Sequence, residues 1–161
     1  MAVNYGLTIG FSSTDLLVAL LVTQFVSFPG TLMILKISDL FSIEKAIMFC
    51  LFIYLVITYF AYSLYSVQQF YMIATLIGFV QGGIQALSRS YFAALIPENR
   101  SSEYFGIYNM LGKFAALLGP ILVGLVTFYT SDSRIGIGSV SIFFILGLIL
   151  FKLSNKHRYS G

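Results

Sequence analysis

Five polar side chains recur at helical spacing inside otherwise apolar stretches of this sequence. Gln81, Gln85 and Arg89 follow one another at intervals of four residues, and Asn109 and Lys113 have the same separation. Residues four apart lie on one face of an α-helix, so each set predicts a polar stripe. Amide and cationic groups inside a membrane usually face a water-filled cavity and mark function. The five residues are therefore candidates for the lining of a substrate path.

A structural interpretation of the two cations stands beside this functional one. Arg89 lies about two turns before Pro97, so its guanidinium could extend to the headgroups at the nearer membrane surface. Lys113 is deeper, at about 15 Å along a helix from Glu103. A lysine there needs a counter-charge, a carbonyl group or water. Both interpretations stay open for Arg89, while a functional or gating role is favoured for Lys113.

Motifs that would support catalysis are absent from the sequence. It contains no P-loop, no HExxH and no C-x-x-C, and its one histidine, His157, lies in the basic tail, where a solvated role is expected. The single cysteine, Cys50, lies in an apolar run and is expected to be a small buried or lipid-facing group. We therefore expect no enzymatic activity, no metal site and no cofactor.

The composition is that of an integral membrane protein. Of the 161 residues, 58% are hydrophobic and 9% are charged, whereas soluble domains have about 25% charged residues. A membrane-spanning helix needs about 20 mainly apolar residues. Stretches without any charged side chain that meet or approach that length include 16–35, 46–88 and 135–151. The middle stretch is long enough for more than one crossing.

Five complete membrane-spanning helices are predicted, over about residues 14–35, 45–65, 70–96, 103–129 and 134–153. The fold class is all-α integral membrane, in a single membrane domain over residues 1–161. Residues 1–11 lack the features of a secretory signal and could be the end of a sixth helix. The second and fifth spans carry no charged residue in their interiors, and we expect them to face lipid around the third and fourth.

The break between the third and fourth spans carries its own start signal. Ser101 or Ser102 is expected to accept a hydrogen bond from a free amide in the first turn of the fourth helix. Glu103 would complement the positive end of that helix.

Small residues line one face of two predicted spans. In the third span they are Ala74, Gly78, Gly82, Ala86, Ser90 and Ala94, and in the fourth they are Gly112, Ala116, Pro120 and Gly124. Such stripes allow close approach of helix backbones, which is the main packing device in lipid. Gly119-Pro120 also predicts a kink. The candidates for helix packing are Gly78, Gly82, Ala86, Gly112, Gly119 and Pro120.

Basic residues are unevenly divided between the two ends of the predicted spans. Only Arg134 falls at one end, while the other end has Lys36, Lys45, Arg100, Lys152, Lys156 and Arg158. Cytoplasmic loops carry the excess of Lys and Arg, so the C-terminus is expected in the cytoplasm. The formal net charge of +3 reflects this topology, and no nucleic-acid partner is expected.

The residues from Gln81 to Gly124, which include QGGIQALSRSYFAALIPENRSSEYFGIYNMLGKFAALLGP, resemble the major facilitator superfamily. More narrowly, they look like the branch related to the vacuolar amino-acid effluxers of autophagy. The resemblance implies that this chain is the C-terminal half of a twelve-helix carrier, cut inside the seventh helix. It also implies that the tenth helix lines the substrate path and that the ninth and twelfth are peripheral. The loop after the eighth helix keeps the Asp of the usual pattern as Asp39, which joins Arg100 and Glu103 as gating-loop candidates.

The resemblance implies transport of a small solute, with amino acids as the implied cargo, by alternating access. The partners would be the lipid bilayer, the solute and an N-terminal half in cis or in trans. The membrane would be the bacterial inner membrane, or the vacuolar membrane in a eukaryote. A truncated, non-transporting fragment or a partner subunit is the alternative, and the DNA immediately upstream would distinguish these interpretations.

The charge distribution predicts the orientation of the chain. A reporter fused after Gly161 should be on the cytoplasmic side, and one inserted near Asp132 should be outside, because the basic residues are retained in the cytoplasm. Fluorescence of the first fusion and phosphatase activity of the second would measure this. The reverse result for either position would contradict both the orientation and the number of crossings.

Overall fold

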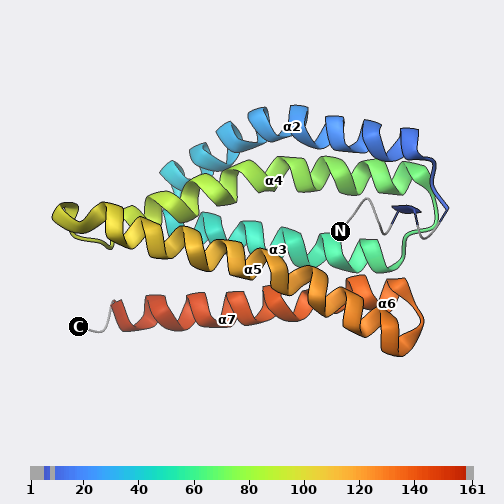
Figure 1. The fold of residues 1–161 in the computed structure, drawn as a ribbon. Coiled ribbons are helices and arrows are strands. Elements are labelled where there is room, and N and C mark those ends of the chain that lie inside the picture. Colours follow the sequence, from blue (N-terminus) through green and yellow to red (C-terminus); the bar gives the residue numbers. More distant parts are fainter. Residues whose placement is uncertain (1–5, 8–9, 159–161) are drawn as a thin grey trace.

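The computed structural model describes residues 6–7 and 10–158, with side chains up to residue 155, and this part of the chain is a bundle of helices (Figure 1). The elements are α2 (Ser13–Leu40), α3 (Ile43–Tyr62), α4 (Val67–Ala93), the 3-10 turn η1 (Glu98–Arg100), α5 (Ser101–Thr130), α6 (Ser133–Gly138) and α7 (Ser141–Arg158). Five helical segments are long and apolar enough to cross a membrane. The predicted all-α membrane fold is confirmed. The expected end of a sixth helix at residues 1–11 falls largely outside the described residues, of which Gly6 and Leu7 are helical.

Successive long helices run in opposite directions along the bundle. Figure 1 shows the α2–α3 turn, η1 and the end of α7 at one end, and the start of α2, the α3–α4 turn and α6 at the other. Lys36, Lys45, Arg100 and Lys152 lie in or near the helix ends of the first group, and Arg134 lies in α6. The two groups of basic residues in the charge count therefore belong to opposite ends of the bundle.

Serine caps set several helix bounds that apolar length alone misplaced. The Ser42 side chain accepts a hydrogen bond from the Lys45 amide at 3.3 Å, so α2 continues to Leu40 and α3 begins at Ile43. Ser66 forms a capping box with Gln69, which starts α4 at Val67.

The expected cap at Ser101 or Ser102 is wrong. There η1 leads directly into α5, whose N-cap is Arg100 without a side-chain hydrogen bond.

The fifth predicted span is divided into α6 and α7 by a turn at residues 139–140. The Ser139 hydroxyl donates to the Gly136 carbonyl at 2.6 Å, and the Ser141 hydroxyl donates to the Gly138 carbonyl at 2.7 Å. Around them, backbone amides bond three residues back instead of four, as in Val140 to Ile137 at 3.1 Å. Serine hydroxyls that compete for carbonyl groups bend helices in this way.

The most extensive interface in the bundle joins α2 and α4, and glycine makes it possible. A Cβ on Gly78 would lie 2.5 Å from the Thr23 carbonyl oxygen, and one on Gly30 would overlap the backbone of Phe79. Next along α4, a Cβ on Gly82 would lie 2.7 Å from the Ser27 hydroxyl. The Thr23 hydroxyl also lies 3.2 Å from the Ala74 carbonyl oxygen across the interface. The two backbones therefore pack directly against each other, as small residues allow in lipid.

The prediction that the second span only faces lipid is wrong for one of its faces. In α3, Ala46, Ile47, Cys50, Ile57 and Thr58 are buried, and the helix packs against α4 and α7. Cys50 is fully buried, which agrees with its expected role as a small apolar group. The outer face of α3 remains exposed, for example at Phe52.

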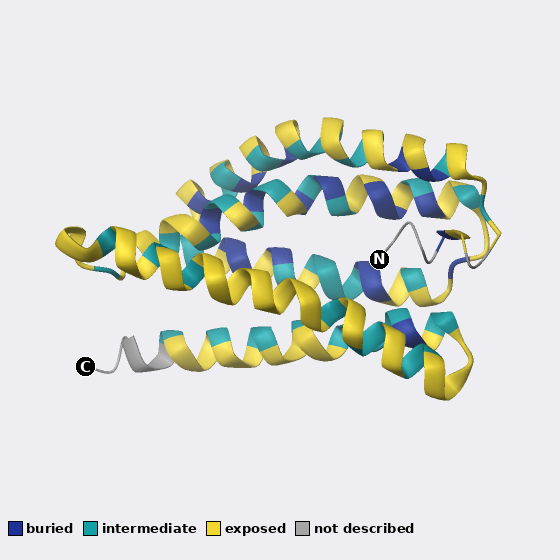
Figure 2. Cartoon of the chain, viewed as in Figure 1, coloured by how far each residue is buried: buried dark blue, intermediate teal, exposed yellow. Residues whose placement is uncertain are grey.

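Helix α5 was expected in the interior, but it has no fully packed face. None of its 30 residues is buried in the described part of the chain, and Figure 2 shows it exposed or half-buried along its whole length. A Cβ added to Gly112 or Gly124 would meet no atom within 4 Å. Among the described residues, no other helix therefore packs closely on Gly112 or Gly124, and the packing role of the α5 stripe, with Gly119 and Pro120, stays a prediction.

The α2–α4 interface can be tested by the same substitution, glycine to alanine, in α4 and in α5, because opposite effects on stability are expected. Gly78→Ala should destabilise the protein by about 1–3 kcal/mol, because the added Cβ meets the Thr23 backbone and one helix must move. Gly124→Ala is the matched control, where the added methyl meets open space and alanine favours the helix. Thermal unfolding of both variants in lipid nanodiscs would measure this. Equal stability of the two variants would show that the interface does not depend on the missing side chain.

Candidate functional site

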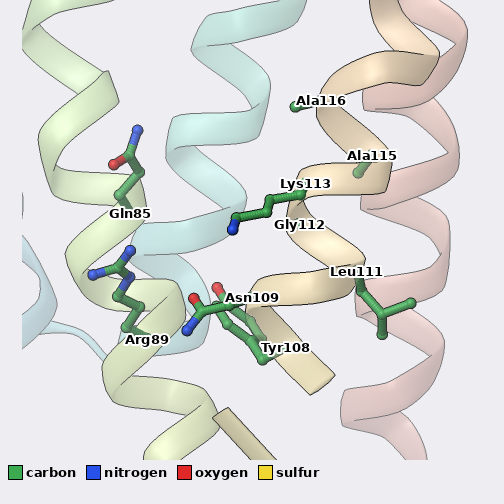
Figure 3. A pocket seen from close by; sticks show the side chains of 9 residues that line it. All are labelled: Gln85, Arg89, Tyr108, Asn109, Leu111, Gly112, Lys113, Ala115 and Ala116. Carbon is green, nitrogen blue, oxygen red and sulfur yellow. The ribbon is translucent and has the colours of Figure 1, made fainter. Parts of the chain in front are cut away.

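A cavity of about 870 Å³ lies between α4 and α5, and it contains most of the polar residues singled out in the sequence. Gln85 and Arg89 contribute from α4, and Asn109 and Lys113 contribute from α5. Figure 3 shows Asn109 and Lys113 extending from α5 toward α4, on which Gln85 and Arg89 lie. The remaining lining residues are Tyr108, Leu111, Gly112, Ala115 and Ala116. The two polar stripes therefore meet across one cavity, although they are separated by a loop in the sequence.

The direction of the two helices brings the cations toward each other. Side chains on an α-helix tilt toward its N-terminus, and α4 and α5 are antiparallel. In Figure 3 the Arg89 side chain accordingly points toward Gln85, away from the end of α4. The Lys113 side chain extends from α5 toward α4. The orientation of Arg89 does not match a guanidinium that reaches for the nearer membrane surface.

The cavity carries positive charge without a compensating acid. In the described part of the chain, Arg89 and Lys113 form no ion pair or hydrogen bond, nor do Gln85 and Asn109. The six acidic residues of the sequence all lie at or near helix ends or in turns: Asp15, Asp39, Glu44, Glu98, Glu103 and Asp132. Lys113, by contrast, is the thirteenth residue of the 30-residue helix α5. It lies about 18 Å from the start of that helix.

Gln81 is the one predicted path residue that lies elsewhere. It borders a smaller cavity of about 180 Å³ between α2 and α4, together with Thr23 and Ala74. The regular spacing of Gln81, Gln85 and Arg89 placed all three on one stripe, but the stripe winds around α4 and only its later part faces α5.

The gating-loop candidates lie at the end of the bundle that carries η1. Asp39 is the penultimate residue of α2, Arg100 is the N-cap of α5, and Glu103 is in the first turn of α5. All three are exposed, and within the described residues no ion pair joins them. Their role in gating stays a prediction.

Sequence reasoning missed three tyrosines that organise the bundle. Tyr108 lines the cavity and stacks on Phe92, with ring centroids 4.7 Å apart. The Tyr71 hydroxyl donates to the Asp15 carboxylate at 3.0 Å, which links α4 to α2. The Tyr91 hydroxyl donates to the side-chain oxygen of Asn155 at 2.7 Å, which links α4 to α7. In the sequence, the only feature that could have identified Tyr108 as a cavity residue was its position next to Asn109 and one turn from Gly112.

The polar groups of the cavity are suited to binding a ligand. The cavity offers a guanidinium, an ammonium and two amides, which together supply many hydrogen-bond donors and few acceptors. Within the described residues, no three His, Cys, Asp or Glu side chains form a group that could hold a metal ion. The described lining contains no nucleophile placed beside a base.

Known proteins resemble this chain over most of its length. Residues 4–160 match the family described as "Vacuole effluxer Atg22 like". The MFS-type transporter YxiO of Bacillus subtilis is 37% identical over 150 residues, which cover 93% of this chain and 35% of that protein. Autophagy-related protein 22 of Vanderwaltozyma polyspora is 38% identical over 81 residues, which cover 50% of this chain and 16% of that protein. No solved structure matches the chain.

The aligned segment is thus about a third of the length of the Bacillus subtilis relative. The family match spans nearly the whole chain, and the five apolar helices agree with a multi-pass membrane protein. The resemblance inferred from residues 81–124 is confirmed. The chain belongs to the Atg22-like vacuole effluxer family, which is related to the transporters of the major facilitator superfamily.

Proposed function

We propose that this chain forms the C-terminal half of a secondary carrier that moves a small solute across a membrane by alternating access. The cavity between α4 and α5 carries this proposal, because it brings polar and cationic side chains of two long apolar helices together in one space. The names of the relatives, an MFS-type transporter and vacuole effluxers, support the same function.

The cavity has walls on some sides only, and this supports a role as half of a carrier. In carriers built from repeats, the substrate site lies near the midplane where two repeats meet. Here α5 has no buried residue, and its glycines at 112 and 124 are open to close approach by another helix. An N-terminal half, in cis or in trans, would cover this surface and complete the site.

The orientation and the cargo belong to the proposal as well. The end with the α2–α3 turn, η1 and the end of α7 would be cytoplasmic because it carries most of the basic residues. The membrane would be a bacterial inner membrane, or a vacuolar membrane in a eukaryote. Amino acids are the proposed cargo.

Transport should require the missing half. The 161-residue chain in proteoliposomes should show no saturable flux, because one wall of a site does not alternate access. A chimaera in which this chain replaces the aligned 150-residue segment of the Bacillus subtilis relative should transport. Flux of a panel of radiolabelled amino acids and organic acids would measure both. Saturable flux by the chain alone would overturn the half-carrier, and none by an intact, inserted chimaera would favour a non-transporting fragment.

In the active chimaera, Arg89→Ala and Lys113→Ala should each reduce transport at least about tenfold, which corresponds to about 1.4 kcal/mol of lost interaction. Membrane insertion should be unchanged. Arg89→Lys keeps the charge but loses the planar fork, so it should stay impaired if Arg89 binds the solute and recover if only charge matters. Lys152→Ala, near the end of α7, is the matched control for loss of a cation. Full activity of both cavity variants would return Arg89 and Lys113 to a structural role.

A further inference from the structure

We propose that the cavity between α4 and α5 selects solutes with net negative charge, and that its preferred ligands are small dicarboxylates. This inference rests on the proposed carrier function and narrows it to one class of solute. If amino acids are the cargo, those with an acidic side chain should be preferred over neutral or basic ones.

The argument begins with the charge balance of the cavity. Arg89 and Lys113 lie on facing helices, and the antiparallel tilt of their side chains directs both into the same space. The lining described here includes no Asp or Glu. Both side chains are exposed in the described part of the chain, and two like charges that line one cavity repel each other. A ligand with two anionic groups would offset this repulsion by pairing with both cations, whereas a neutral ligand would not.

The hydrogen-bonding groups of the cavity favour the same class. A guanidinium presents five N–H donors, and an ammonium presents three, while neither accepts a hydrogen bond. Asn109, Gln85 and Tyr108 add groups that both donate and accept. Carboxylates accept only, so they match these donors well. A primary amide in place of a carboxylate would direct its own N–H groups at donors and leave them unpaired.

The positions of the two cations, Arg89 and Lys113, also favour pairing with an anionic group. Lys113 is the thirteenth of the 30 residues of α5, and Arg89 points away from the nearer end of α4. Intramembrane cations pair with an acid, a carbonyl group or a solute. An acidic side chain of the other half is the rival partner, and it predicts the opposite effect of charge removal on stability.

The first test compares L-glutamate with L-glutamine in the chimaera, because the two solutes have nearly the same shape and differ in one charge. The value of kcat/KM for glutamate should exceed that for glutamine at least about tenfold, since a site built for one group rejects an analogue that cannot pair with it. Succinate should compete with glutamate, and succinamate should not. The double variant Arg89→Gln, Lys113→Gln should lose most of this preference, and Lys152→Gln should keep it.

The second test measures thermal unfolding of the chimaera without solute. If the cations await an anionic solute, the double glutamine variant should be at least as stable as the parent protein, because a repulsion is removed. It should also lose the stabilisation that succinate gives the parent protein. If the cations pair with acids of the other half, the same variant should be less stable, because those acids are left unpaired.

The outcomes separate the two proposals. Flux with equal kcat/KM for glutamate and glutamine, or a destabilised double variant that keeps its glutamate preference, would overturn the charge selection and leave the carrier function standing. Absence of saturable flux for every solute in the panel would contradict the carrier function itself.

Discussion

The close approach of α2 and α4 is the contact on which the rest of the bundle depends. Lipid is as apolar as the side chains, so helices in a membrane gain little from hydrophobic burial and associate through dense packing. Gly30 and Gly78 let one backbone touch the other, and Thr23 adds a hydroxyl contact across the interface. A single added Cβ at either glycine would separate the pair. This contact therefore fixes the rotation of α4 about its axis.

That rotation decides which side chains face the cavity. With the small residues of α4 turned toward α2, the later part of the neighbouring polar stripe, Gln85 and Arg89, faces α5. The earlier member, Gln81, lies beside α2. Tyr71 and Tyr91 hold α4 at its two ends through hydrogen bonds to Asp15 and Asn155. The position of Arg89 is thus set by packing and hydrogen bonds of α4 that do not involve Arg89 itself.

One wall of the cavity is formed by α5, whose surface is exposed or half-buried along its whole length. None of the 30 residues of α5 is buried, and a Cβ added to Gly112 or Gly124 would meet no atom within 4 Å. The cations lie beside this surface and have no acid near them in the described lining. Charge and shape therefore support the same proposal, in which further helices would complete this wall and a ligand or those helices would balance its charge.

Composition and the helical period of 3.6 residues were enough to predict four features from the sequence. These are the number of long apolar helices, the helix ends that carry the basic residues, the small-residue stripes and the polar stripes. Helix ends such as Ile43 and Val67 were misplaced, because serine caps set them and apolar length does not. The buried face of α3 was missed for a physical reason, since buried and lipid-facing residues of a membrane helix have the same apolar composition. Only the tertiary structure decided which helices are neighbours, and hence that Arg89 and Lys113 share one cavity.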